Sequence, residues 1–218
     1  IRMGLELLGH DRAGASQRAE IARSIDELDQ LIDEILLASR LDARDANDAS
    51  ALGPTEEVDL VGLAAEECAR TGADLEIAPG GSSLLVQGHP RLLRRLLRNL
   101  LENARRYGRP VSGAEADPGE PQVRLTLSQR SGSGSRASTT GASGVAVLWV
   151  DDRGPGVPTE LQARIFEPFY RLPGASEKEG GVGLGLSLVK SIAERHRGLV
   201  RCDSRPGGGA RFVVELPL

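Results

Sequence analysis

Hydrophobic residues recur at helical spacing in one stretch that dominates the pattern of the chain. Between His89 and Tyr107 they make one broad apolar face, formed by Leu92, Leu93, Leu96, Leu97, Leu100 and Leu101. Spacings of three and four residues predict an amphipathic helix. Pro90 suits its first position, and Gly108 suits its end. Because the face is broad, we expect this helix to pack on a sheet.

The first 42 residues predict two helices joined by a turn at residues 9–16. In the second helix the apolar residues alternate at spacings of four and three: Ile21, Ile25, Leu28, Ile32 and Ile35. This alternation is typical of a helical bundle. We therefore expect an α-helical hairpin at 1–42, which packs on the rest of the chain or, as we favour, on a second copy in a four-helix bundle.

Residues 43–54 are polar and end in Gly-Pro, which predicts a linker, so that the second domain covers residues 55–218. Within that domain, short strand patterns occur at 58–60, 75–77, 84–86, 122–127, 145–150, 199–203 and 210–216. The stretch 145–150 is apolar on both faces, which predicts a central strand with Trp149 in the core. Helices and antiparallel strands in layers predict an α+β fold, a two-layer α/β sandwich with its helices on one face.

Composition narrows the possible partners of the chain. The 218 residues carry a net charge of -4, which argues against a nucleic-acid-binding surface. No apolar run is long enough to span a bilayer, so we expect no membrane contact by this part of the chain. Cys68 and Cys202 match no metal spacing and are expected to be small core residues. The chain opens inside an apolar pattern, so we expect it to be a fragment of a longer protein.

Polar side chains form a second stripe on the long helix. Asn99 and Asn103 are one turn apart, and Arg106 and Tyr107 continue the stripe. Asparagine is a mediocre helix former, so two in register need a reason. One interpretation is a solvated polar face. The other is a site, because an amide oxygen suits Mg²⁺, a guanidinium suits phosphate, and a tyrosine ring packs on a base.

Two glycine-containing stretches add candidate binding chemistry. Residues 151–156 read D-D-R-G-P-G, and an aspartate at a strand end can accept a hydrogen bond from an exocyclic amine. Residues 180–187 read G-G-V-G-L-G-L-S and open a helix, where backbone N–H groups and the helix dipole favour a phosphate. They match neither a Walker loop nor a Rossmann fingerprint, and a glycine hinge is the alternative. Between them, the aromatic-rich stretch 165–171 predicts the anchor of a lid at 170–181.

Four stretches, in order, resemble the N, G1, F and G2 boxes of bacterial two-component sensor histidine kinases: N-L-L-E-N-A-R-R-Y, D-R-G-P-G, F-E-P-F-Y-R and G-V-G-L-G-L-S. The resemblance covers the chain after residue 55. It implies the Bergerat-type ATP-binding fold of the GHKL superfamily, which is shared with DNA gyrase and MutL-type ATPases. The hairpin at 1–42 resembles part of that family's dimerisation and histidine phosphotransfer domain.

The resemblance implies a site for ATP and Mg²⁺. Asn103 would coordinate Mg²⁺, with Asn99 assisting nearby. Arg106 would meet the phosphates, and Tyr107 would line the adenine pocket. Asp152 would recognise the adenine amine. The γ-phosphoryl group would then pass in line to a histidine, with positioning and Mg²⁺ supplying most of the catalysis.

Loop residues complete the site that the resemblance implies. Gly154 and Gly156 would permit close approach of the nucleotide, and Arg171 would reach the γ-phosphate from the lid. The triphosphate would be wrapped by the glycine-rich stretch: Gly181, Val182, Gly183, Leu184, Gly185, Leu186 and Ser187. The implied partners are a response-regulator receiver domain and a second copy bound through the hairpin. The implied location is the cytoplasm, with the parent protein anchored in the bacterial inner membrane.

One departure from the family concerns the phosphoryl acceptor. No box around an acceptor histidine is found in this sequence. His10 falls in the predicted turn, His89 precedes a helix as a cap or solvent residue, and His196 fits a cation at a helix end. We interpret all three as structural. We expect the acceptor box to precede Ile1, so that this chain cannot autophosphorylate alone.

Three functions therefore compete. The first is the ATP-binding catalytic region of a sensor histidine kinase. The second is another enzyme on the same fold, such as a gyrase-like ATPase or an anti-sigma serine kinase. A gyrase-like enzyme would need an acidic base where Asn99 stands, and the hairpin has no role in an anti-sigma kinase. The third is a non-catalytic nucleotide-binding regulatory module, against which the four intact boxes argue.

Overall fold

The computed structural model describes residues 54–108, 121–131, 144–173 and 182–218, together with Arg18, Ile21, Ile32 and residues 35–37. In chain order the elements are β1 (Glu56–Asp59), α3 (Leu60–Thr71), β2 (Asp74–Ile77), β3 (Leu85–Gly88), α4 (Pro90–Tyr107), β4 (Val123–Ser131), β5 (Gly144–Asp152), α5 (Gly185–Arg195), β6 (Leu199–Ser204) and β7 (Ala210–Pro217). Two short 3-10 helices, Thr159–Leu161 and Arg164–Phe166, lie between β5 and α5.

The main sheet has the strand order β2-β4-β5-β7-β6, so β5 is central, as the sequence predicted. Strands β4, β5, β7 and β6 pair antiparallel, but β2 pairs parallel with β4. The expectation of antiparallel strands alone was therefore wrong for β2. The chain passes from β2 through β3 and α4 before it enters β4, and a long crossover of this kind allows a parallel pair. Strands β1 and β3 form a separate antiparallel pair.

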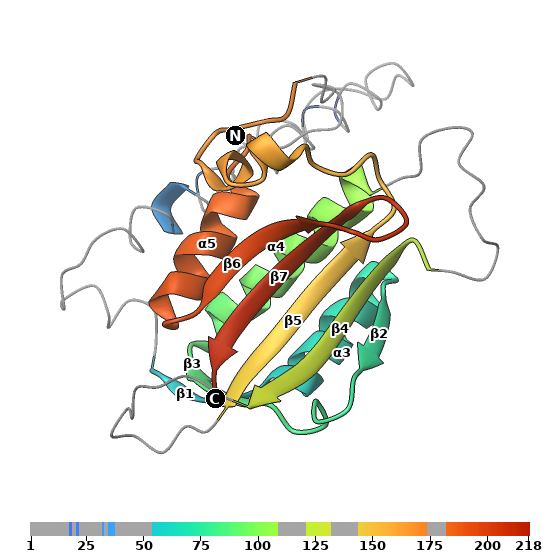
Figure 1. Ribbon diagram of the computed structural model, residues 1–218. Coiled ribbons are helices and arrows are strands. Elements are labelled where there is room, and N and C mark those ends of the chain that lie inside the picture. Colours follow the sequence, from blue (N-terminus) through green and yellow to red (C-terminus); the bar gives the residue numbers. More distant parts are fainter. Residues whose placement is uncertain are drawn as a thin grey trace.

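The helices α3, α4 and α5 lie behind the sheet in Figure 1 and cover one of its faces. The predicted apolar face of α4 is buried, from Leu92 through Leu101. Alternate residues of β5, Ala146, Leu148 and Val150, are buried with it in the same core. Burial of leucine side chains between a helix layer and a sheet is the main stabilising term here. The predicted two-layer α/β sandwich is thus confirmed.

Gly108 ends α4, and it is needed there because of a tertiary contact that the local sequence pattern does not show. Gly108 donates its N–H to Ala104 O at 2.7 Å, with a φ of −85° that any residue could adopt. A Cβ on Gly108 would lie only 2.5 Å from the Cβ of Asp152. Glycine is therefore required for the close approach of α4 to the end of β5.

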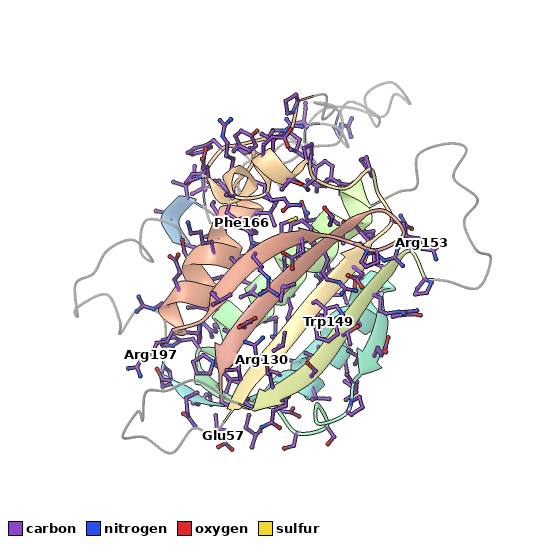
Figure 2. All side chains as sticks on the ribbon, in the orientation of Figure 1. Glu57, Arg130, Trp149, Arg153, Phe166 and Arg197 are labelled. Atoms are coloured by element: carbon purple, nitrogen blue, oxygen red, sulfur yellow. The ribbon has the colours of Figure 1, made fainter. Side chains whose placement is uncertain are left out.

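Trp149 lies on the open face of the sheet, so the prediction that it packs in the core was wrong. Side chains alternate across a strand, and the helices cover only the face that takes Leu148 and Val150. Trp149 is half-buried there, with the guanidinium of Arg211 5.8 Å from its ring centre. Arg211 in turn binds Asp151 through two hydrogen bonds of 2.6 and 2.7 Å. Figure 2 shows Trp149 and Arg130 on the side of the sheet that faces the viewer.

A buried carboxylate joins α3 to α4. Glu67 accepts hydrogen bonds from Arg70 on its own helix and from Arg94 and Arg98 on α4. Burial would raise the pKa of Glu67, but the hydrogen bonds and charges of Arg98 and Arg70 outweigh it, and the pKa is lowered. Glu67 is therefore ionised at neutral pH, and it fixes α4 against α3.

The structure describes six residues of the predicted hairpin. Arg18, Ile21, Ile32 and residues 35–37 are helical. The Ile21, Ile32, Ile35 and Leu36 side chains are exposed, and Leu37 packs on the core of the sandwich. The rest of the hairpin at 1–42, including the turn with His10, and residues 43–53 of the predicted linker lie outside the described residues. No helix in the described part of the chain is long and apolar enough to cross a membrane.

Candidate nucleotide-binding site

Asp152 stands at the end of β5, on the face that the helices cover. It is 5% exposed, and its Oδ1 accepts hydrogen bonds from the N–H groups of Gly154 (2.9 Å) and Ala210 (3.1 Å). Burial raises the pKa of the Asp152 carboxyl, while these two backbone hydrogen bonds oppose the rise. Two donors on one oxygen fix the orientation of the group. Oδ2 is then the oxygen that can accept a hydrogen bond from a ligand.

Three backbone segments meet around Asp152, and glycines allow them to do so. A Cβ on Gly154 would overlap the carbonyl oxygen of Tyr107, at the end of α4. A Cβ on Gly209, in the turn between β6 and β7, would overlap the carbonyl oxygen of Asp152 itself. Gly156 has a φ of 76°, and its Cβ would lie 3.0 Å from Gly209 O. In this structure these glycines allow neighbouring backbone segments to approach one another closely. Their contact with a nucleotide stays a prediction.

The polar stripe of α4 runs between Asp152 and the start of α5. Asn99 is 7% exposed, and its Nδ2 donates to Gly185 O at 3.1 Å. Asn103, one turn further, is half-buried, and its amide makes no hydrogen bond to another described residue. Arg106 is exposed and Tyr107 half-buried, and the Tyr107 carbonyl lies against Gly154. Asn103 therefore lies one helical turn from Asn99, which contacts the start of α5, and one turn from Tyr107, which contacts the loop after Asp152.

The glycine-rich stretch leads into α5 as predicted, and α5 begins at Gly185. Gly183 has a φ of 82°, and its carbonyl accepts a hydrogen bond from Phe169 N–H at 3.0 Å. Phe169 itself has a φ of 63° and a side chain that is 60% exposed. A phenylalanine in the left-handed region is strained and is held there by its surroundings. Val182, Leu184, Leu186 and Ser187 complete the described part of the stretch, and Gly181 lies outside the described residues.

The aromatic-rich stretch 165–171 anchors the segment that precedes the predicted lid. Phe166 is buried and meets Phe212 of β7 edge to face, with ring centres 6.5 Å apart. Tyr170 lies under the guanidinium of Arg164, at 4.6 Å. Arg171 is half-buried beside it, and residues 174–181 of the predicted lid lie outside the described residues. The contact of Arg171 with a γ-phosphate stays a prediction.

His196 is a neutral side chain that links two helices, a role called here the neutral clasp, and the prediction that it acts as a cation was wrong. Its Nδ1 lies 2.7 Å from Ile192 O and so donates, while its Nε2 accepts from His89 N–H at 3.1 Å. Burial lowers the pKa of His196, and His89 and Arg195 add to the effect. His196 thereby joins the end of α5 to the start of α4. His89 occupies the cap position of α4, but its side chain makes no capping hydrogen bond.

Sequence reasoning missed the turn between β6 and β7 as part of the site. Gly207, Gly208 and Gly209 have φ values of 88°, 95° and 98°, and they carry Ala210 N–H to Asp152. The run R-P-G-G-G between two strand patterns is typical of a simple turn. Three consecutive glycines were the available signal, but Asp152, which accepts from the Ala210 N–H that follows them, is 58 residues away from Ala210 along the chain.

The chain resembles known proteins in this region and beyond it. Residues 88–218 match the family model described as histidine kinase-, DNA gyrase B-, and HSP90-like ATPase. Sensor protein RstB of Escherichia coli is 34% identical over 231 residues, which cover 100% of this chain and 45% of RstB. Sensor-type histidine kinase PrrB of Mycobacterium bovis is 32% identical over 220 residues, which cover 100% of this chain and 44% of PrrB. The chain thus spans less than half the length of these relatives.

Solved structures share the fold. A full-length ShkA in complex with AMPPNP has a TM-score of 0.66 at 25% identity, over 98% of this chain and 40% of that one. The Acinetobacter baumannii histidine kinase AdeS has a TM-score of 0.61 at 18% identity, over 97% of this chain and 87% of that one. The second likeness supports the fold alone, which agrees with the sandwich described above.

Proposed function

This chain belongs to the family of histidine kinase-, DNA gyrase B- and HSP90-like ATPases, and from that premise we propose that it is the ATP-binding catalytic region of a sensor histidine kinase. The observation that carries the proposal is the Asp152 carboxylate. It is buried, oriented by two backbone donors, and placed beside the end of the helix that bears Asn103.

Adenine is the base that Asp152 suits. A carboxylate oxygen accepts a hydrogen bond, and the exocyclic amine of adenine donates one. Guanine presents a carbonyl oxygen at the corresponding position, which a carboxylate would repel. Tyr107, half-buried at the end of α4, supplies an aromatic wall for the base.

The donor set of the site fits Mg²⁺ held between protein and phosphates. The described residues contain no group of three or more His, Cys, Asp or Glu side chains that could hold a metal. Mg²⁺ accepts few protein ligands and keeps waters and phosphate oxygens. The amide oxygen of Asn103 suits that arrangement. The backbone N–H groups at the start of α5, from Gly185, would meet the phosphate charge, with Arg106 and Arg171 as further cations.

The reaction that follows is transfer of the γ-phosphoryl group to a histidine nitrogen. A nitrogen–phosphorus bond forms, the bond from the γ-phosphorus to the bridging oxygen breaks, and ADP leaves with that electron pair. His196 does not suit the acceptor role, because it is buried and both ring nitrogens are hydrogen-bonded. We propose that the acceptor histidine lies on another segment, which this chain meets in a dimer formed through residues 1–42.

The remaining parts of the proposal concern partners and location. The phosphoryl group would pass from the histidine to an aspartate of a response-regulator receiver domain. This region would act in the cytoplasm, and the whole protein would be anchored in the bacterial inner membrane. The sensor proteins and histidine kinases among its relatives support the transfer to a response regulator.

Calorimetric titration with MgATP tests the proposal. Asp152→Asn keeps the Oδ1 acceptor for Gly154 and Ala210 but replaces Oδ2 by an NH2 group, which cannot accept from adenine. Loss of a hydrogen bond to a charged acceptor should weaken binding roughly 10- to 100-fold. Asp203→Asn is the matched control, because the Asp203 carboxylate pairs with Arg201 on the open face of the sheet, away from Asp152. Undiminished affinity in Asp152→Asn would refute the adenine assignment.

A further inference from the structure

Asn99 makes a hydrogen bond to α5, whereas Asn103, one turn further along α4, makes none to another described residue. Its side chain is 7% exposed, and Nδ2 donates to the backbone oxygen of Gly185 at 3.1 Å. A carbonyl oxygen can only accept, so the NH2 group must face it, and the orientation of the amide follows from chemistry. A Cβ on Gly185 would lie 3.9 Å from Asn99 Cγ, an ordinary van der Waals distance, so the Asn99 amide lies close beside the start of α5.

The acceptor of this hydrogen bond is the first residue of α5. Backbone N–H groups in the first turn of a helix have no partner within the helix, and they are the groups that would meet the phosphates. On α4, Asn103 lies one turn beyond Asn99. The Asn99 amide therefore joins the helix that would hold the metal to the helix start that would hold the triphosphate.

We propose, resting on the ATP-binding function proposed above, that Asn99 is a positioning residue that sets the distance between Asn103 and the first turn of α5. It acts through the Gly185 carbonyl and not as a ligand of Mg²⁺. Position 99 must then carry a hydrogen-bond donor. A carboxylate there would place an oxygen about 3.1 Å from the Gly185 oxygen, and the two would repel.

The two roles make different predictions for binding. A metal ligand contributes only when Mg²⁺ is present. A positioning residue contributes whenever the phosphates occupy the first turn of α5, with or without the metal. It contributes nothing to a ligand that lacks phosphates, because adenosine would reach only the Asp152 end of the site.

The test is calorimetry on the full chain with three probes: MgATP, ATP in the presence of EDTA, and adenosine. Asn99→Asp removes the donor at almost unchanged size, and Asn99→Ala removes the whole amide. We expect both variants to bind ATP about tenfold more weakly with Mg²⁺ and in EDTA, while adenosine affinity is unchanged. Asn103→Ala is the matched control on the same stripe, and it should lose affinity only when Mg²⁺ is present.

Three results would overturn the proposal. One is a loss in Asn99→Asp confined to the titration with Mg²⁺, which would make Asn99 a metal ligand. Another is an equal loss for adenosine, which would indicate general damage to the fold. The third is wild-type affinity for ATP in both Asn99 variants. If the wild-type chain binds no ATP, or Asp152→Asn binds it undiminished, the proposed function fails instead.

Discussion

Replacing Gly209 by alanine should damage the site far more than the same change two residues earlier. Gly207 and Gly209 belong to one turn and share the left-handed backbone, with φ values of 88° and 98°. They differ in their surroundings. A Cβ on Gly207 would meet nothing within 4 Å. A Cβ on Gly209 would overlap the Asp152 carbonyl oxygen, 2.8 Å from its carbon and 3.1 Å from Arg153 Cα.

The magnitude follows from three contributions. Alanine in the left-handed region costs about 1 kcal/mol at either position. At Gly209 the overlap is with backbone, which cannot rotate away, and overpacking of this kind costs about 1–3 kcal/mol. The turn must move, which weakens the 3.1 Å hydrogen bond from Ala210 N–H to the buried Asp152 carboxylate. That loss costs about 1–3 kcal/mol more.

Thermal unfolding and ATP calorimetry together measure the difference. For a chain of this size, 1 kcal/mol shifts Tm by roughly 2–4 °C. Gly207→Ala should therefore lower Tm by a few degrees and leave ATP affinity unchanged. Gly209→Ala should lower Tm by roughly 6 °C or more and weaken ATP binding at least tenfold. Equal effects of the two substitutions would refute the argument, because the steric contribution would then be absent.

Three further predictions concern the histidines and the hairpin. Burial lowers the pKa of His196 below its ordinary 6.5, so the unfolded chain takes up this proton at a higher pH than the folded chain does. The contribution of neutral His196 to the free energy of unfolding is therefore complete above pH 6.5. It is lost as pH falls from 6.5 towards the folded-state pKa. Urea unfolding from pH 5 to 8 should show this slope, and His196→Gln should flatten it; an unchanged slope would contradict the neutral clasp. Incubation with γ-labelled ATP should leave the chain unlabelled, and acid-labile label that disappears in His10→Ala would contradict the structural interpretation of His10. Removal of residues 1–16 should weaken self-association in analytical ultracentrifugation, and an unaltered association constant would remove the support for a bundle formed by the hairpin.

Local patterns in the sequence were enough to predict most of the elements. The helix Pro90–Tyr107 follows from apolar spacing of three and four, because that period matches the helical turn. The central position of β5 follows from its apolar residues on both faces. Asp152 at a strand end and the glycine-rich entry to α5 follow from residue types whose chemistry is local. These features depend on neighbours within a few residues, which the sequence displays directly.

Other features depended on which distant segments meet. Trp149 is a large apolar residue in the central strand, as core residues often are. It nevertheless lies on the face that no described helix covers, beside Arg211. His196 has the position of a cation at a helix end, yet the start of α4 buries it and donates to it. Neither outcome is encoded in the neighbouring residues, because burial is decided by the partner element. A pKa or an exposed fraction is therefore fixed only once the layers have assembled.

The site divides in the same way. Residue types, their order and the helical period that places Asn99 and Asn103 on one stripe can be read along the chain. The hydrogen bond from Asn99 to the first residue of α5, and the place of Gly209 and Ala210 around Asp152, follow from how distant elements pack. Both contacts join residues more than 50 positions apart in the chain. Their geometry is set by the packing of α4 against α5 and of β5 beside β7, which no local period specifies.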